Sequence, residues 1–319
     1  MFNINDLERQ INIVNDTIKC TIKNCKTYVK IQSKKFIRDN RFLCPVHNIY
    51  ISPSTYDYLE EKDNLLDFSS KELQLLNEIK KFKRECRLSR ERSEDAVTWN
   101  VFRALTNSML LSRFLEITFD DSSEIIDTVF WSVSLNEKQP YKLLNKARTE
   151  FGETIERGTE PDLIIETKDT VYFIEAKLTA SNRTPNKKEI DEKKNNPKKY
   201  KTGGNKLFNS IFNSSYENQI DLQFYELSRL WLLGNWISKE SCKNFVLVNL
   251  VLAKKEKEIE TSFGGTIIQD KTRYFKRITW ESIYSFFEAT NSDLPVLDYM
   301  KYKSFGYSSN GEKNKGFSL

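Results

Sequence analysis

Two carboxylates and one lysine lie in the segment GTEPDLIIETKDTVYFIEAKLTA, residues 158–180, at a spacing that could support catalysis. Two β-rich runs within it flank Lys168-Asp169, which is typical of a tight hairpin turn. If that turn is two residues long, Asp162 faces Glu175 across the antiparallel pair, with Cβ atoms about 4.5–5.5 Å apart. Alternation then places Lys177 on the same face as Glu175. Unless the register slips by one residue, the hairpin presents the three side chains as one cluster.

Such a cluster suits phosphodiester hydrolysis. Two facing carboxylates repel each other, and a divalent cation between them removes the repulsion. Carboxylate oxygens suit Mg²⁺, which keeps several waters and also binds substrate phosphate. The metal acidifies bound water and stabilises charge on the phosphate, and a nearby lysine adds a fixed positive charge. The segment therefore predicts a Mg²⁺ (or Mn²⁺) site with Asp162 and Glu175 as ligands and Lys177 beside the reacting phosphate.

A second group of candidate ligands lies near the N-terminus, where Cys20-x4-Cys25 is followed by Cys44-x2-His47. Three cysteines and one histidine form an ordinary tetrahedral zinc set, and a closed site of four protein ligands is structural rather than catalytic. The alternative is a set of reduced core cysteines beside a hydrogen-bonded histidine. Zinc is favoured because the chain's single histidine stands at ligand spacing from a cysteine.

The elements that must position these residues follow from hydrophobic patterning. Near residue 71 the residue pattern changes from one that favours β-strands to one that is charged and favours helices. We therefore expect a zinc-ribbon-like module over 1–70, a larger domain over 71–305 and a polar tail over 306–319. Helices on both sides of a central mixed sheet would give an α/β core. Helices are expected at 93–116, 141–151, 215–238, 279–287 and 294–302, and strands at 129–133, 162–167, 170–178, 245–253 and 265–269.

Pro161-Asp162, twelve intervening residues and then Glu175-Ala176-Lys177 resemble the bipartite motif of the PD-(D/E)XK nuclease superfamily, over residues 90–290 of this chain. The resemblance implies a restriction-endonuclease-like core in which Asp162, Glu175 and Lys177 are catalytic. A bare match is common by chance, and the alternative is a solvent-facing hairpin of mixed charges. The apolar strands on both sides of the turn favour the nuclease interpretation.

In that superfamily a helix before the sheet often supplies another acidic metal ligand. Glu94, at the start of SEDAVTWNVFRAL, resembles that residue. Members often carry a Gln or a Tyr on the helix after the motif, where this chain offers Gln219, Gln223 and Tyr225. The strict Gln-x-x-x-Tyr pattern of one subgroup is not met, because Asp221 stands four residues before Tyr225. The resemblance therefore adds Glu94 to the site and leaves the later helix without an assigned role.

Composition excludes several other functions. The 319 residues carry 50 Lys and Arg against 45 Asp and Glu, and the net charge of +5 is too small to name a polyanionic partner. His47 is the only histidine, which excludes paired-histidine phosphodiesterases and disfavours a Ser-His-Asp hydrolase. The absence of a G-x-x-x-x-G-K-[ST] motif excludes a P-loop ATPase. Few cysteines, a polar N-terminus and no long apolar run predict a soluble, cytoplasmic protein.

A basic stretch, residues 181–206, follows soon after Lys177 and holds nine Lys and Arg against three Asp and Glu. It could follow a phosphate backbone near the scissile bond. It could equally be a solvated loop of a chain rich in Lys and Asn. The stretch therefore supports a polyanionic substrate only modestly.

Two functions of different classes remain. The first is a Mg²⁺-dependent endonuclease acting on double-stranded DNA, with restriction or defence against foreign DNA as a further hypothesis. The second is a catalytically inactive, zinc-stabilised DNA-binding or adaptor protein. Intact Asp162, Glu175 and Lys177 favour the first, and RNA stays open as a substrate because nothing in the sequence identifies a reader of the 2′-hydroxyl. A homodimer or a partner protein is not readable from the sequence.

Overall fold

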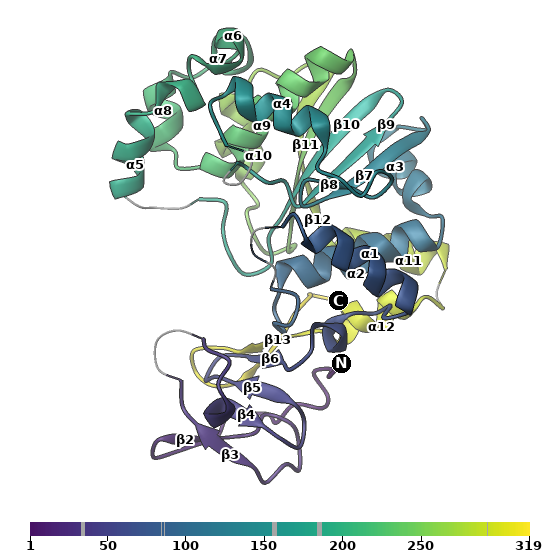
Figure 1. Ribbon diagram of the computed structural model, residues 1–319, viewed down its shortest axis with the longest axis vertical. Coiled ribbons are helices and arrows are strands. Elements are labelled where there is room, and N and C mark those ends of the chain that lie inside the picture. The colour runs from purple at the N-terminus through teal and green to yellow at the C-terminus, as the bar shows by residue number, and fades with distance from the viewer. Residues whose placement is uncertain (33–35, 84, 86, 155–157, 184–186, 292) are drawn as a thin grey trace. The chain divides into compact units, whose positions relative to one another are not determined.

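The computed structural model describes residues 1–32, 36–83, 85, 87–154, 158–183, 187–291 and 293–319, with only the backbone of residues 187–189 (Figure 1). The chain divides into two compact units. One comprises residues 1–73, 86–107 and 281–319, and the other comprises residues 74–85 and 108–280. The predicted module, domain and tail stay predictions, because they concern which parts of the chain fold and act on their own.

The second unit is built around a six-stranded mixed sheet with the order β12-β11-β10-β9-β7-β8. β10, β11 and β12 run parallel, whereas β9 is antiparallel to both β10 and β7, and β8 is antiparallel to β7. The β12 strand was not predicted. The strands are β7 (Ile125–Phe130), β8 (Val133–Ser134), β9 (Leu163–Thr167), β10 (Thr170–Ala176), β11 (Asn244–Val251) and β12 (Arg273–Thr279).

Helices cover both faces of this sheet (Figure 1). α9 (Tyr225–Ser241) packs on β10 and β11 and against α4 (Lys142–Glu150). On the opposite face, the ring of Phe119 in α3 (Leu111–Phe119) lies 4.9 Å from the ring of Tyr172 in β10. Gly234 permits the close approach of α9, because a Cβ there would lie 2.0 Å from the Phe245 ring. The predicted class, an α/β fold with a mixed sheet flanked by helices, is confirmed.

Short helices fill the connections, and two long predicted helices are broken. The helix predicted over 93–116 divides into α2 (Glu94–Asn107) and α3, with Met109 between them at φ +59°. The helix predicted over 215–238 divides into α8 and α9, with Gln223 at φ +67°. The strand predicted over 265–269 is also wrong, since a 3₁₀ turn covers Gly264–Thr266. The short helices are α5 (Lys187–Lys194), α6 (Gly203–Lys206), α7 (Phe208–Ile211), α8 (Tyr216–Asp221) and α10 (Ile259–Ser262).

The first unit carries two three-stranded antiparallel sheets from the N-terminal part of the chain. Its helices α2 and α12 (Pro295–Tyr302) contact each other, and β13 (Ser304–Tyr307) pairs with β14 (Lys313–Lys315). α1 (Ser70–Lys80) and α11 (Trp280–Thr290) each contain residues of both units. The sheet strands are β1 (Ile13–Val14), β2 (Thr17–Lys19), β3 (Tyr28–Lys30), β4 (Leu43–Cys44), β5 (Ile49–Ile51) and β6 (Tyr56–Tyr58). Within the described residues, no helix has the length and apolar character needed to cross a bilayer.

Candidate active site and metal cluster

The β9–β10 hairpin has the predicted register. Leu163 pairs with Ile174, and the two-residue turn is Lys168-Asp169. Continuing the register by one residue places Asp162 opposite Glu175. The backbone N–H of Ala176 donates a hydrogen bond of 2.8 Å to Asp162 Oδ2, which fixes that carboxylate at the end of β10. The structure therefore brings Asp162 and Glu175 together at one edge of the sheet.

Glu175 is a buried acid with two nearby acidic neighbours. Its side chain is enclosed, and burial raises the pKa of its carboxyl well above the usual value. The Lys177 ammonium acts against this rise, whereas the charges of Asp162 and Glu226 add to it. Lys177 Nζ lies 2.5 Å from Glu175 Oε1, so lysine and acid form a direct ion pair. Burial and the two neighbouring carboxylates thus make the ionised form of Glu175 costly, which is a condition that a cation relieves.

The backbone of Lys177 is held from two further elements. Its N–H donates to the carbonyl of Leu250 at the end of β11, and its own carbonyl accepts a hydrogen bond of 3.2 Å from Trp280 Nε1. These bonds continue the parallel β10–β11 pairing beyond the last residue of β10. Lys177 therefore leaves the sheet from a fixed point, with its side chain toward Glu175.

Sequence reasoning missed Glu226. It lies in the first turn of α9, and its Oε2 is 3.0 Å from Lys177 Nζ. The ammonium of Lys177 is thus shared by a buried and a half-exposed carboxylate, Glu175 and Glu226. A signal existed, since an acidic residue suits the N-terminus of a helix. The prediction of one continuous helix over 215–238 hid the fact that a helix begins at Tyr225.

The Gln and Tyr residues considered in the helix predicted over 215–238 serve packing and the turn between α8 and α9. Gln219 is buried in α8 and donates to Ser228 Oγ at 2.9 Å. Tyr225 is buried, with Lys193 Nζ lying 3.9 Å from the centroid of its ring. Gln223 occupies the left-handed residue between α8 and α9. These contacts give Gln219 and Tyr225 structural roles.

Asn249 is a second residue that the sequence did not single out. It pairs in register with Glu175 across β10 and β11, so both side chains lie on the same face of the sheet. Asn182 Nδ2 donates to Asn249 Oδ1 at 2.8 Å, and both amides donate to Glu256 Oε2. Glu256 Oε1 also accepts from the backbone N–H of Asn182. This network fastens the segment that follows Lys177 to the end of β11.

A hollow of about 500 Å³ lies in the second unit, next to Trp131. The backbone N–H of Trp131 donates to the Asp162 carbonyl, and Trp131 lines the hollow together with Lys83 and Arg148. Arg148 is buried and donates to neutral acceptors, the Thr159 carbonyl and Ser132 Oγ. Lys83 Nζ is 3.1 Å from Glu160 Oε1 and 4.6 Å from the centroid of the Trp131 ring. The hollow is therefore lined by both basic and acidic side chains, and the backbone of Trp131 links it to Asp162.

The basic stretch is more engaged with its own unit than its composition suggests. Lys194 pairs with Asp221 at 2.6 Å, Lys199 with Glu153 at 3.3 Å and Lys201 with Glu217 at 3.5 Å. The side chains of Lys187 and Lys188 lie outside the described part of the chain. Intramolecular pairing accounts for several of these lysines, so the stretch is in part a structural feature.

Glu94 lies at the start of α2, in the first unit. Asp162, Glu175 and Lys177 belong to the second unit. The structure thus joins three of the four predicted catalytic residues in one cluster. The part of Glu94 in the site stays a prediction.

The four predicted zinc ligands Cys20, Cys25, Cys44 and His47 form one group, with all their ligand atoms within 4.8 Å of one another. The Cys25 and Cys44 sulfurs are 3.8 Å apart, and the sulfur of Cys20 lies 3.5 Å from His47 Nδ1. A tetrahedral ion with bonds of about 2.3 Å to sulfur and about 2.0 Å to nitrogen requires separations of about 3.8 and 3.5 Å. These two separations therefore match those of a tetrahedral zinc site.

The cluster also favours a thiolate. The hydrogen bond from Cys20 lowers the pKa of the Cys44 thiol to about 4, with a further contribution from His47 against the effect of burial. The pKa of the Cys20 thiol rises in turn, through the same hydrogen bond and through burial. The thiolate is the form that binds metal. All three cysteines are in the small N-terminal core with Leu7 and Ile18.

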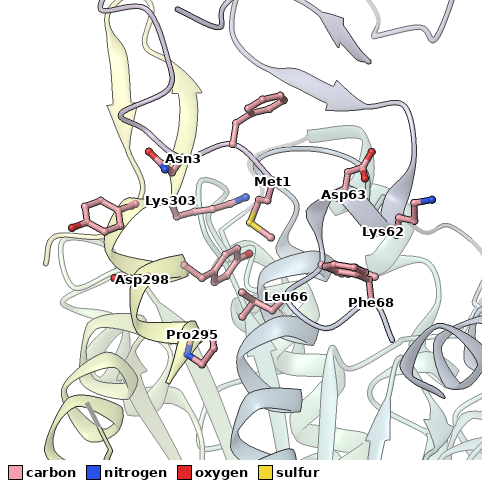
Figure 2. A pocket seen from close by; sticks show the side chains of 13 residues that line it. Met1, Asn3, Lys62, Asp63, Leu66, Phe68, Pro295, Asp298 and Lys303 are labelled. Atoms are coloured by element: carbon pink, nitrogen blue, oxygen red, sulfur yellow. The ribbon is translucent and has the colours of Figure 1, made fainter. Parts of the chain in front are cut away.

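Another hollow, of about 590 Å³, lies within the first unit (Figure 2). Figure 2 shows Met1, Leu66, Phe68 and Pro295 around it with Lys303 beside Met1, and the charged Lys62, Asp63 and Asp298 also line it. None of the predicted catalytic residues or metal ligands lines it. Its walls are mostly apolar, and it has no lining residue in common with the carboxylate cluster.

Comparison with known proteins adds a family. No match was found among the curated proteins, and none was found among the solved structures. The model of one family, described as restriction endonucleases associating with ARP, matches residues 26–303, which include the carboxylate cluster and part of the Cys3His group. Because this match spans most of the chain, the protein belongs to the family of restriction endonucleases associating with ARP.

Proposed function

We propose that this protein is a Mg²⁺- or Mn²⁺-dependent endonuclease of the PD-(D/E)XK type that hydrolyses double-stranded DNA. Membership of a restriction endonuclease family supports a nuclease-like role. The observation that carries the proposal is the meeting of Asp162, Glu175 and Lys177 at one edge of the mixed sheet. Asp162 and Glu175 would hold the metal, and Lys177 would face the reacting phosphate.

The residues present fit such a metal ion. Oxygen ligands from one or two carboxylates are what Mg²⁺ takes from a protein when substrate phosphate completes its shell. Burial and the neighbouring charges of Asp162 and Glu226 make ionised Glu175 costly, although Lys177 is close. A divalent cation would compensate this excess of negative charge. When bound, the metal acidifies water and draws charge from the phosphate.

The remaining work falls to the chain's own groups. The Ala176 N–H and the register of β9 and β10 orient Asp162, so the chain itself holds this carboxylate opposite Glu175. The Lys177 ammonium supplies a fixed positive charge where the reacting phosphate gains negative charge. Trp280 and β11 hold the backbone of Lys177 and keep this charge in place. In this proposal, Glu94 is a further acidic ligand of the metal, from a different element, and contributes less than Asp162 or Glu175.

The Cys3His group would hold one structural zinc ion. Its four protein ligands would close the coordination shell, which leaves no position for substrate. Cys20, Cys25 and Cys44 are themselves part of the small N-terminal core, so a zinc ion bound there would contribute directly to its folding. We assign this ion to stability and to the shape of the N-terminal sheets.

Cleavage assays test the proposed reaction. Full-length protein is incubated with double-stranded DNA, single-stranded DNA and RNA, each with Mg²⁺, Mn²⁺, Ca²⁺ or EDTA. We expect cleavage of duplex DNA with Mg²⁺ or Mn²⁺, and none with EDTA. Cleavage of RNA alone would make the protein a ribonuclease. Binding of DNA without cleavage in any metal would instead identify a catalytically inactive adaptor.

A further inference from the structure

The ammonium of Lys177 contacts one of the two oxygens of a carboxylate that is proposed to bind metal. Its Nζ is 2.5 Å from Glu175 Oε1, and the side chains of both residues are almost fully enclosed. A divalent cation bound to Glu175 would stand close to this ammonium, and like charges repel strongly in an enclosed site. This repulsion would weaken the contact of Lys177 with Glu175 and favour its displacement when metal binds.

Glu226 offers the place to which Lys177 can turn. Its Oε2 already lies 3.0 Å from Lys177 Nζ, so the contact exists before any metal arrives. Glu226 comes from α9, a different element from the hairpin that carries Asp162 and Glu175. Its side chain is 55% exposed, against 6% for Glu175, so the Glu226 carboxylate stays hydrated while it pairs.

The position of Glu226 in its helix makes this partner a fixed one. The chain turns at Gln223, which has φ +67°, and α9 begins at Tyr225. The carboxylate thus lies in the first helical turn, where the helix dipole favours a negative charge. Buried residues on the next turns of α9, among them Leu227 and Leu230, anchor the helix on the sheet.

We propose that Glu226 is a positioning residue for Lys177, which retains the ammonium beside the site when a metal ion displaces it from Glu175. This inference rests on the proposed metal-dependent nuclease function. Without Glu226, displaced Lys177 would lose the carboxylate that α9 places 3.0 Å from its Nζ. Metal binding would then be weaker, and the ammonium would be less well placed for the phosphate.

The test is a double-mutant cycle read by metal binding. Mn²⁺ affinity of the full-length, zinc-loaded protein is measured by calorimetry for wild type, Glu226→Gln, Lys177→Met and the double variant. We expect Glu226→Gln to weaken Mn²⁺ binding by about three- to fivefold in the wild-type background, the range of a partly exposed ion pair. In the Lys177→Met background the same change should have an effect of about twofold or less, from screened charge alone.

Two further variants separate contact from charge. Glu240→Gln removes an equal charge from the exposed, distant end of α9 and should leave Mn²⁺ affinity unchanged. Glu226→Asp keeps the charge on a shorter side chain, and its Mn²⁺ affinity should lie between those of wild type and Glu226→Gln. An equal effect of Glu226→Gln in both lysine backgrounds would overturn the positioning role. If Asp162→Asn leaves Mn²⁺ binding intact, the proposed metal site itself fails, and the inference fails with it.

Discussion

The carboxylate of Glu153 accepts two hydrogen bonds from Thr159, one from its backbone N–H and one from Oγ1, each 2.7 Å long. Thr159 stands three residues before Asp162, and its carbonyl accepts from the buried Arg148. Glu153 is itself buried and paired with Arg229 at 2.8 Å. The segment leading to Asp162 is therefore fixed by a buried ionic network that reaches from α4 to α9.

Removing the charge of Glu153 should destabilise the second unit. Burial alone would raise the pKa of Glu153, but Arg229, Thr159 and Lys199 together outweigh it and hold the pKa below the usual value. Glu153→Gln leaves Arg229 buried without its charged partner, which typically costs about 3–5 kcal/mol of unfolding free energy. Urea denaturation measures the loss. Glu150→Gln, at the exposed end of α4, is the matched control and should change stability by less than about 0.5 kcal/mol.

The hairpin that carries the candidate site was predictable because its determinants are local. A two-residue turn between apolar runs fixes the register, and the register alone places Asp162 opposite Glu175. The Cys3His group was predictable from ligand spacing, which reflects the chemistry of the ligands and not the rest of the fold. These successes concern contacts whose cause lies within a few residues or in residue type.

The predictions that failed concern interruptions within helical segments and an edge strand of the sheet. Met109 and Gln223 adopt left-handed conformations inside segments of helical periodicity, which apolar spacing cannot reveal. Strand β12 has the sequence RYFKRIT, whose charged residues suit an edge strand but mask its pattern. The break at Gln223 also concealed Glu226, because only the true start of α9 places that side chain near Lys177. Tertiary packing decided all of these.

Loss of zinc should unfold the N-terminal sheets. Purified without chelators, the protein is expected to contain about one zinc ion per chain, by elemental analysis. His47→Ala or Cys44→Ser should release it and reduce the protection of residues 1–70 in hydrogen exchange, because ligand loss removes folding energy. Cys242→Ser changes an exposed cysteine outside the cluster and should retain the zinc. Wild-type protein without stoichiometric zinc would contradict the assignment.

Asp57 should make the protein less stable as the pH rises from about 4 to 6. Its carboxyl is 3% exposed, and Arg90 Nε lies 3.7 Å away. Burial raises the pKa of Asp57 to about 6, although Arg90 and other arginines oppose the rise. Between the unfolded pKa and about 6, the native carboxyl keeps a proton that the unfolded chain has lost, so stability falls with increasing pH.

Asp57→Asn should remove this dependence. Melting temperatures of the variant and of wild type are compared at pH 4, 5, 6 and 7. The difference in favour of the variant should increase up to pH 6 and then level off. The corresponding gain in unfolding free energy is about 1–3 kcal/mol. Asp16→Asn, at an exposed position in the same unit, provides the control and should follow wild type at each pH. A constant difference between Asp57→Asn and wild type would show that Asp57 does not titrate in this range.

Substitutions in the proposed catalytic cluster should have the largest effects on cleavage. Asp162→Asn and Glu175→Gln keep the shape of each side chain but remove the charges proposed to hold Mg²⁺, so each should abolish cleavage of duplex DNA. Lys177→Ala should lower the rate by about 10²–10³-fold, the usual effect of losing one donor to the transition state. Glu94→Gln should act in the same direction more mildly, because Glu94 is proposed to complete the metal shell from a different element.

The opposite end of the same hairpin supplies matched controls. Asp169→Asn and Lys168→Ala make the same chemical changes in the exposed turn that joins β9 to β10. Single-turnover cleavage at saturating Mg²⁺ should be near the wild-type rate for both, while circular dichroism shows all variants folded. If Asp162→Asn and Lys177→Ala cut as fast as these controls, the cluster is not the catalytic site. Their inactivity beside active turn variants would locate the reaction at the edge of the sheet where β10 ends.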